Sequence, residues 1–402
     1  MDHNVRKLAF LCDLYIAIWA IYCVHWYSIM PGTSFDSISS LCLAINIAFS
    51  IVCFFSLQGK KLPILFKGIN ILLVFFLIYG LFPIINGGEI YKHVDISPGS
   101  FLIGPLRSFL PIFVFYYFGV QGVLTEKRIR IYFVVFFILY LFFFMSFNNL
   151  KMAESSRDAF TNNLGYIFVS LIPFVFFFNT RIYLKFSLAF FIFLVVLFSM
   201  KRGAILVGVI SLLYVIIMQW KSSSGKQKWL FVVIFTFILY IAFHYSYSFF
   251  ASNEYFLMRI NDTLSGDSSG RDWITKSILH FYFDEASFIQ KLFGGGADNS
   301  MYICGGYQAH NDWLEILANQ GLFGIVFYLF FWLTTIKQIK IMSKETMVKY
   351  VLSLTLLGIF IKTFFSMSYA SFPTTYGLLI GYCLSQYKIN EKTRTIKFQK
   401  YV

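Results

Sequence analysis

The stretch "ILFKGINILLVFFLIYGLFPII", residues 64–85, decides the fold class of this chain. A helix rises about 1.5 Å per residue, so this stretch is long enough to cross a hydrocarbon core of about 30 Å. Similar apolar runs recur along the chain, which is 58% hydrophobic and only 13% charged, with a mean hydropathy of +0.70. A soluble domain carries charge on about a quarter of its residues. The sequence therefore predicts an all-α polytopic integral membrane protein.

About twelve apolar runs are predicted to be transmembrane helices. They cover residues 8–28, 38–57, 64–85, 101–124, 130–147, 161–179, 183–200, 203–220, 229–250, 320–336, 349–368 and 371–387. We expect three parts: residues 1–250 with spans one to nine, residues 251–312 as a large loop domain with short helices, and residues 313–402 with the last three spans and a basic tail. The first run is longer than the apolar core of a cleavable signal peptide, so we expect it to be retained.

The basic residues are concentrated in alternate connections between these runs, which predicts that those connections and both termini are cytoplasmic. The opposite set of connections contains most of the acidic residues and includes the long segment 251–312. The net charge of +14 is thereby explained by membrane topology, and the expected partner is the lipid bilayer rather than nucleic acid. No internal repeat is visible, which counts against a secondary transporter because many of these are built from repeats.

The most motif-like polar run is "GYQAHNDWLEILANQGLFG", residues 306–324, at the outward end of the long loop. Asp312 followed by Glu315 three residues later predicts a capping box at a helix start. Gly321 fits a helix stop or bend, and Gly324 is expected to keep one helix face small for close packing.

His310 is then predicted to lie just before a helix N-terminus, where the helix dipole disfavours the imidazolium form. A neutral imidazole can act as a general base. The residues fit equally well an interfacial histidine that is bonded to a loop carbonyl. Both interpretations stay open on the residues alone.

Two glycine-rich turns lie in the long loop. "SGDSSGRDWI" (265–274) is expected to lead into a helix from about Asp272 to Phe283. "LFGGGADNS" (292–300) has three consecutive glycines, which can present backbone N–H groups to phosphate or sugar. The alternative is that this run is only a flexible turn.

Four cations converge on the predicted outer leaflet. Lys201 and Arg202 lie together in the short outward turn "SMKRGAIL" (199–206), against the positive-inside pattern. Arg107 and Lys362 each lie about six residues, or roughly 9 Å, below the outward ends of their spans. Intramembrane charges are costly and are functional candidates, so a shared anion such as a lipid diphosphate would suit them. Snorkelling of each long side chain is the alternative.

Two further features carry less information. Asp13, near the inward end of the first span, is expected to be a structural partner of another polar group. The six cysteines show neither a disulfide framework nor metal-ligand spacing, and no metal or cofactor is expected.

The motif His310-Asn311, nine residues, then Gly321-x-x-Gly324 resembles the H-N-x9-G-x-x-G pattern of the bacterial O-antigen polymerase and O-antigen ligase superfamily. The Lys-Arg-Gly-Ala turn at 201–204, "GRDxW" at the start of the loop helix and "LFGxG" before the histidine motif are similar to that family too. The resemblance is motif-specific over roughly residues 199–325 and only architectural elsewhere.

The resemblance implies a GT-C-like membrane glycosyltransferase of the bacterial inner membrane, with its site facing the periplasm. It implies a glycan donor and acceptor carried on undecaprenyl diphosphate, with His310 as catalytic base and inversion at the anomeric carbon. Because the lipid diphosphate is a good leaving group, cations can stabilise it without a metal. The diphosphate or glycan candidates are, in order, Arg202, Lys201, Arg271, Arg107, Asn311 and Lys362. Pairing with a chain-length regulator is left open.

Polymerase and ligase share the donor and the histidine motif. A polymerase transfers the glycan to another lipid-linked repeat, whereas a ligase transfers it to lipid A core. The "GRDxW", "LFGGG" and "AHNDWLEIL" segments look more like those of the polymerases, so polymerase is favoured over ligase. A flippase or exporter of lipid-linked oligosaccharide would predict internal symmetry and charges at the midplane, and a scaffolding protein would need no cations in its spans.

Overall fold

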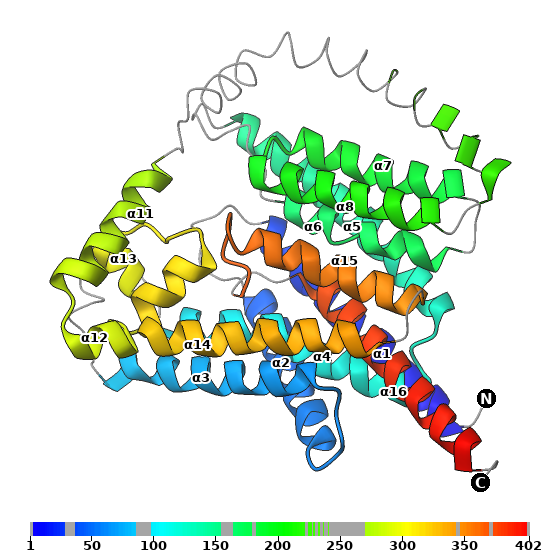
Figure 1. Cartoon of the computed structure of the whole chain (residues 1–402), viewed down its shortest axis with the longest axis horizontal. Coiled ribbons are helices and arrows are strands. Elements are labelled where there is room, and N and C mark those ends of the chain that lie inside the picture. The colour runs from blue at the N-terminus through cyan, green and yellow to red at the C-terminus, as the bar shows by residue number, and fades with distance from the viewer. Residues whose placement is uncertain are drawn as a thin grey trace. The chain divides into compact units, whose positions relative to one another are not determined.

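The computed structural model is all-helical over the residues that it describes, which are 3–28, 37–85, 98–153, 164–178, 182–221, 270–342, 346–369, 373–399 and scattered positions between 224 and 240. The chain forms two compact units (Figure 1). The first unit combines Met1–Ile129 with Trp273–Val402, and the second is Arg130–Asp272. Residues far apart in sequence therefore build the first unit together.

The first unit is made of long apolar helices and a group of short ones. The long helices are α1 (His3–Ser28), α2 (Ser37–Leu57), α3 (Leu65–Ile85), α4 (Pro98–Val120), α14 (Asp312–Ile341), α15 (Met347–Lys362) and α16 (Thr374–Gln399). The short ones are α11 (Arg271–His280), the π-helical turn η3 (Phe281–Glu285), α12 (Phe288–Phe293) and α13 (Asn299–Ile303). The expected helix from Asp272 to Phe283 is thus present as α11 and η3.

The second unit contains most of α5 (Glu126–Ala153), which begins in the first unit, and then α6 (Gly165–Val169), the 3-10 helix η2 (Ile172–Phe177), α7 (Ile182–Phe198) and α8 (Arg202–Lys221). Within the sixth predicted span, the described residues change from α-helical geometry in α6 to 3-10 geometry in η2. Pro173 accounts for the change, since it lies in the first turn of η2 and has no N–H for an α-helical bond to the preceding turn.

Apolar helices of membrane-spanning length confirm the coarse prediction of a helical membrane protein. Five described helices are long and apolar enough to cross a bilayer: Ser37–Leu57, Leu102–Val120, Glu126–Ser146, Arg202–Lys221 and Asp312–Ile341. Shorter apolar helices cover Leu65–Gly80, Gly165–Phe177 and Tyr183–Phe198. The full set of twelve spans stays a prediction, and the ninth, 229–250, lies largely outside the described residues.

Close helix packing in the first unit depends on glycines. A Cβ added at Gly381 of α16 would lie 2.7 Å from the Ile112 carbonyl oxygen and 2.7 Å from Phe115 Cβ of α4. Gly377, one turn earlier, faces Pro111 of the same helix. This small-x-x-x-small spacing lets two membrane helices approach backbone to backbone.

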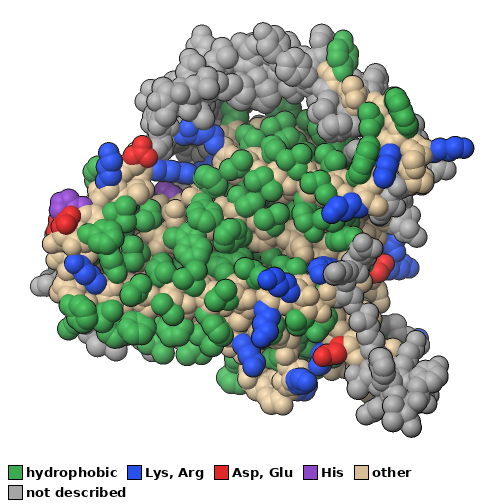
Figure 2. Space-filling model, viewed as in Figure 1, with side chains coloured by type: hydrophobic (Ala, Val, Ile, Leu, Met, Phe, Trp, Pro, Cys, Tyr) green, Lys and Arg blue, Asp and Glu red, His purple; other side chains and the backbone are tan. Residues whose placement is uncertain are grey.

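α14 packs against α3 and exposes its other side. Gly68 of α3 has room only because it lacks a Cβ, since Thr334 of α14 fills that position. The side of α14 that faces away from α3 carries exposed apolar side chains: Leu322, Phe323, Val326, Leu329, Phe330, Leu333 and Ile336. Figure 2 shows hydrophobic side chains covering the surface over α3 and α14. Such a surface suits contact with lipid chains.

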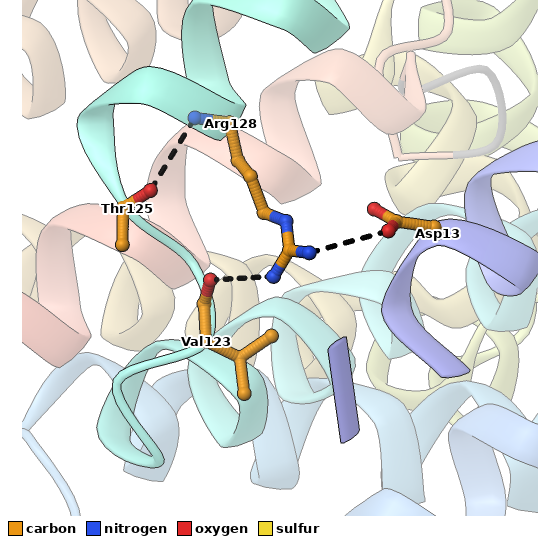
Figure 3. A network of polar contacts seen from close by, with 4 residues as sticks. All are labelled: Asp13, Val123, Thr125 and Arg128. Atoms are coloured by element: carbon orange, nitrogen blue, oxygen red, sulfur yellow. Dashed lines mark hydrogen bonds and ion pairs between the residues drawn. The ribbon is translucent and has the colours of Figure 1, made fainter. Parts of the chain in front are cut away.

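The predicted structural role of Asp13 is confirmed. Its carboxylate Oδ2 lies 3.3 Å from Arg128 Nη2, and Arg128 Nη1 donates to the Val123 carbonyl oxygen at 3.1 Å (Figure 3). The pair links α1 to the start of α5, and the bond to Val123 links Arg128 to the turn between α4 and α5. The ion pair with Arg128 accounts for a carboxylate at this position of the predicted span, and no ligand is needed.

Candidate functional site

The residues of the histidine motif lie where α13 gives way to α14. The helix begins as expected, but the predicted capping box is wrong. Asn311 is the N-cap: its Oδ1 accepts from the backbone N–H of Trp313 at 2.9 Å and of Leu314 at 3.3 Å. Asp312 is the first helical residue, and its side chain and that of Glu315 have other partners in the fold.

The predicted bend at Gly321 is confirmed. Its φ of 63° and ψ of −156° interrupt α14 one third of the way along. A Cβ at Gly321 would lie 2.5 Å from the backbone nitrogen of Gly294 and 2.7 Å from the carbonyl oxygen of Leu292. The backbone of the glycine turn therefore lies directly against the backbone of the helix break.

The glycine turn satisfies the carbonyl groups that the break releases. Gly295 N donates to the Ala318 carbonyl oxygen and Gly296 N to that of Asn319, both at 3.0 Å. The side chain of Asn299 also donates to Ala318 O at 3.0 Å. Gly294 N donates to Gln290 O at 2.7 Å. These three N–H groups are bonded within the protein, so they do not form the phosphate cradle that was one interpretation of the run.

The small space at Gly324 has a different use from the one predicted. A Cβ there would lie 2.6 Å from Gln320 Cβ and 2.7 Å from Ile316 Cγ2. Both neighbours belong to the part of α14 that precedes the break. Gly324 thus allows the two parts of α14 on either side of the break to pack closely. We had expected it to allow packing against another helix.

Glu315 is fully buried and collects three donors. Ser300 Oγ donates to Oε1 at 2.5 Å, Asn319 Nδ2 donates to Oε1 at 3.0 Å, and the backbone N–H of Ala309 donates to Oε2 at 2.8 Å. The Ala309 bond fixes the chain immediately before His310. The three donors offset part of the cost of removing this carboxylate from water.

Asp312 is also fully buried and ties the helix start to distant segments. Its Oδ2 accepts from Tyr328 OH at 2.6 Å and its Oδ1 from the backbone N–H of Ser368 at 2.6 Å. Its own N–H donates to Thr363 O at 2.8 Å, and Trp313 Nε1 donates to Thr363 Oγ1 at 3.0 Å. The chain just after His310 is therefore anchored to the end of α15.

His310 is exposed between these two anchors. Its φ of 51° lies in the left-handed region, which non-glycine residues rarely adopt. The bond from Ala309 to Glu315 and the cap at Asn311 hold both neighbours in place. Strained backbone geometry that is fixed on both sides is characteristic of functional positions. The arrangement presents an imidazole at the surface on a rigid support.

Arg107 and Lys362, predicted on separate spans, come together near Asp312 in the first unit. Lys362 is buried, and it interacts electrostatically with both Asp312 and Arg107. Arg107 Nη1 donates to Tyr22 OH at 3.0 Å. Asp312 therefore lies within electrostatic range of Lys362, and binding of diphosphate by either cation stays a prediction.

The other predicted cations belong to the second unit. Lys201 and Arg202 lie in the short turn between α7 and α8, as expected, and Arg202 is the first residue of α8. Gly165 of α6 packs against Ser199 and Ala204 on either side of the turn. Arg271 is the first residue of α11. Their convergence with His310 on one anion stays a prediction.

Sequence reasoning missed the buried network around Glu315 and Asp312. Ser300 and Asn319 are ordinary polar residues in sequence, and their link to Glu315 depends on the glycine turn folding back onto α14. One signal was available: polar residues at 312, 315, 319 and 320 recur on one face of an otherwise apolar helix. Comparison of the chain with models of known protein families and with curated proteins finds no match in either.

Proposed function

We propose that this chain is a membrane glycosyltransferase of the O-antigen polymerase type. The observation that carries the proposal is the exposed His310, held in left-handed geometry between a buried glutamate anchor and an asparagine cap. The motif spacing from His310 to the two glycines, together with the membrane-spanning helices, supports the same assignment.

In the proposed reaction, an acceptor sugar hydroxyl of one lipid-linked repeat attacks the anomeric carbon of a second lipid-linked glycan. His310 takes the hydroxyl proton as the new C–O bond forms. The bond from the anomeric carbon to the diphosphate oxygen breaks, and undecaprenyl diphosphate leaves with the electron pair. Attack opposite to the leaving group inverts the anomeric centre. We place the site on the periplasmic face of the bacterial inner membrane.

Arg202, with Lys201 and Arg271, is proposed to neutralise the departing diphosphate. Guanidinium groups match phosphate oxygens in bidentate geometry. Arg202 is the first residue of α8, where the helix dipole already favours an anion. Arg107, Lys362 and Asn311 are secondary candidates for contact with diphosphate or glycan.

The experiment is a transfer assay with the purified full chain in lipid nanodiscs and undecaprenyl diphosphate-linked repeat units as the only glycan. A polymerase is expected to yield a ladder of lengthened glycans on the lipid carrier, with undecaprenyl diphosphate released in proportion. A second reaction adds lipid A core. Transfer that occurs only with lipid A core would establish the ligase alternative, and recovery of the repeat units unchanged in both reactions would refute the proposal.

A further inference from the structure

Helix α12 carries apolar side chains that the described residues of the first unit leave largely exposed. Phe288 and Ile289 are 75% and 69% exposed, and Phe293 is 49% exposed. These positions are spaced by one and by four residues, so they lie on one side of a helix. Exposed aromatic and aliphatic side chains grouped in this way indicate an apolar binding surface.

The opposite side of α12 is fixed by polar contacts. Ser287 and Gln290 form a reciprocal capping box at the helix start. Lys291 Nζ donates to Phe283 O at 2.8 Å, and Tyr282 OH donates to Lys291 O at 3.0 Å. These bonds hold the polar side toward η3, so the apolar face is turned outward by the fold itself.

The end of α12 is joined to two helices with apolar outer surfaces. Tyr79 OH of α3 donates to Phe293 O at 2.6 Å. The ring of Phe293 stacks on that of Phe323 in α14, with centroids 4.9 Å apart. Phe323 and the neighbouring Leu322 are themselves exposed. The apolar face of α12 is therefore continuous with the surface of α14, and Figure 2 shows hydrophobic side chains extending over both.

We propose that α12 is a membrane-interface anchor, with Phe288 and Ile289 inserted at the level of the lipid headgroups, in the leaflet that the proposed function places on the side of His310. Continuity with the apolar surface of α14 identifies lipid as the occupant. Aromatic residues favour this depth, and a short amphipathic helix can lie in the plane of the interface. Through the glycine turn and the break at Gly321, the anchor would set the height of His310 above the bilayer.

Spin labelling of the full chain in lipid nanodiscs tests the anchor. Single labels are placed by Ile289→Cys on α12, by Leu329→Cys on the exposed side of α14, and by Lys276→Cys, an exposed position on α11. The six native cysteines are buried, which limits background labelling. The ratio of collisions with oxygen to collisions with a water-soluble nickel chelate reports the depth of each label.

The expected ratio at Ile289 is severalfold higher than at Lys276 and lower than at Leu329. A ratio at Ile289 equal to that at Lys276 would overturn the proposal, because the face would then be in water. A label at Ile289 that neither reagent reaches would mean that protein covers the face. Dipolar broadening between labels would then identify a second copy of this chain as that occupant. Neither negative result affects the proposed transferase, which the glycan assay tests separately.

Discussion

Two buried carboxylates hold the chain on either side of one exposed histidine. Glu315 binds the N–H of Ala309, while Asp312 accepts from Tyr328 and Ser368. Each carboxylate has hydrogen-bond donors, which offset part of the cost of burying it. The backbone on both sides of the histidine is therefore held in place by contacts within the fold.

Asp298 has a less favourable position in the same network. Burial, and then the nearby charge of Glu315, raise the pKa of Asp298 from 3.8 to about 6, and one of its oxygens is buried without a hydrogen-bond partner. Because the folded-state pKa is the higher one, its contribution to stability is fully present below about pH 4 and is lost as the pH rises through about 6. The loss amounts to about 2–3 kcal/mol.

Asp298→Asn is expected to remove this loss, since asparagine stays neutral and tolerates the left-handed φ of 58° at this position. The thermal unfolding midpoint of the variant in detergent should exceed that of the wild type by more at pH 7.5 than at pH 5. Glu285→Gln, at an exposed carboxylate of the same segment, controls for a general change of charge. An equal difference at both pH values would show that Asp298 does not titrate in this way.

At the scale of elements, the break in α14 and the glycine turn form one unit. The break releases the carbonyl groups of Ala318 and Asn319, and the turn supplies the N–H groups that bind them. Neither feature is satisfied without the other, because buried backbone groups need partners. The unit also joins α12 and α13 to the start of α14, where His310 is presented.

Gly321→Ala is expected to disrupt this unit. Alanine pays about 1–3 kcal/mol for a backbone conformation that essentially only glycine adopts, and its Cβ would collide with the backbone of Leu292 and Gly294. A lower thermal unfolding midpoint and faster tryptic cleavage after Lys291 should result. Gly122→Ala is the matched control, since Gly122 has a similar φ of 71° but no atom within 4 Å of an added Cβ. Equal effects of the two substitutions would mean that the close backbone contact is not formed.

For the whole molecule, much of the helical framework could be predicted from apolar runs, because each run must satisfy its backbone internally within a membrane. Single prolines were a poorer guide to where a helix changes or ends. Pro173 coincides with a change from α-helix to 3-10 helix, whereas α4 continues through Pro105 and Pro111. Tertiary packing decides which of these outcomes occurs, and it is not visible in a local pattern.

The site could be predicted only in part, for a related reason. The bend at Gly321 follows from the conformational freedom of one residue. The N-cap was predicted at the wrong residue, because Asn311 and Asp312 are adjacent and both side chains can cap a helix. The side chain of Asp312 does not cap the helix because it accepts hydrogen bonds from Tyr328 and Ser368, which lie farther along the chain. The packing of α16 on α4 did have a signal, the spacing of Gly377 and Gly381.

The activity of His310→Ala in the glycan-transfer assay tests the central claim most directly. His280→Ala is the matched control, since His280 is an exposed histidine whose Nδ1 pairs with Asp284 at 3.2 Å on α11 and η3. Loss of a general base is expected to lower kcat by about 10²–10⁴-fold, with the unfolding midpoint unchanged and His280→Ala close to the wild type. A His310→Ala protein that lengthens lipid-linked glycans at the wild-type rate would contradict the account.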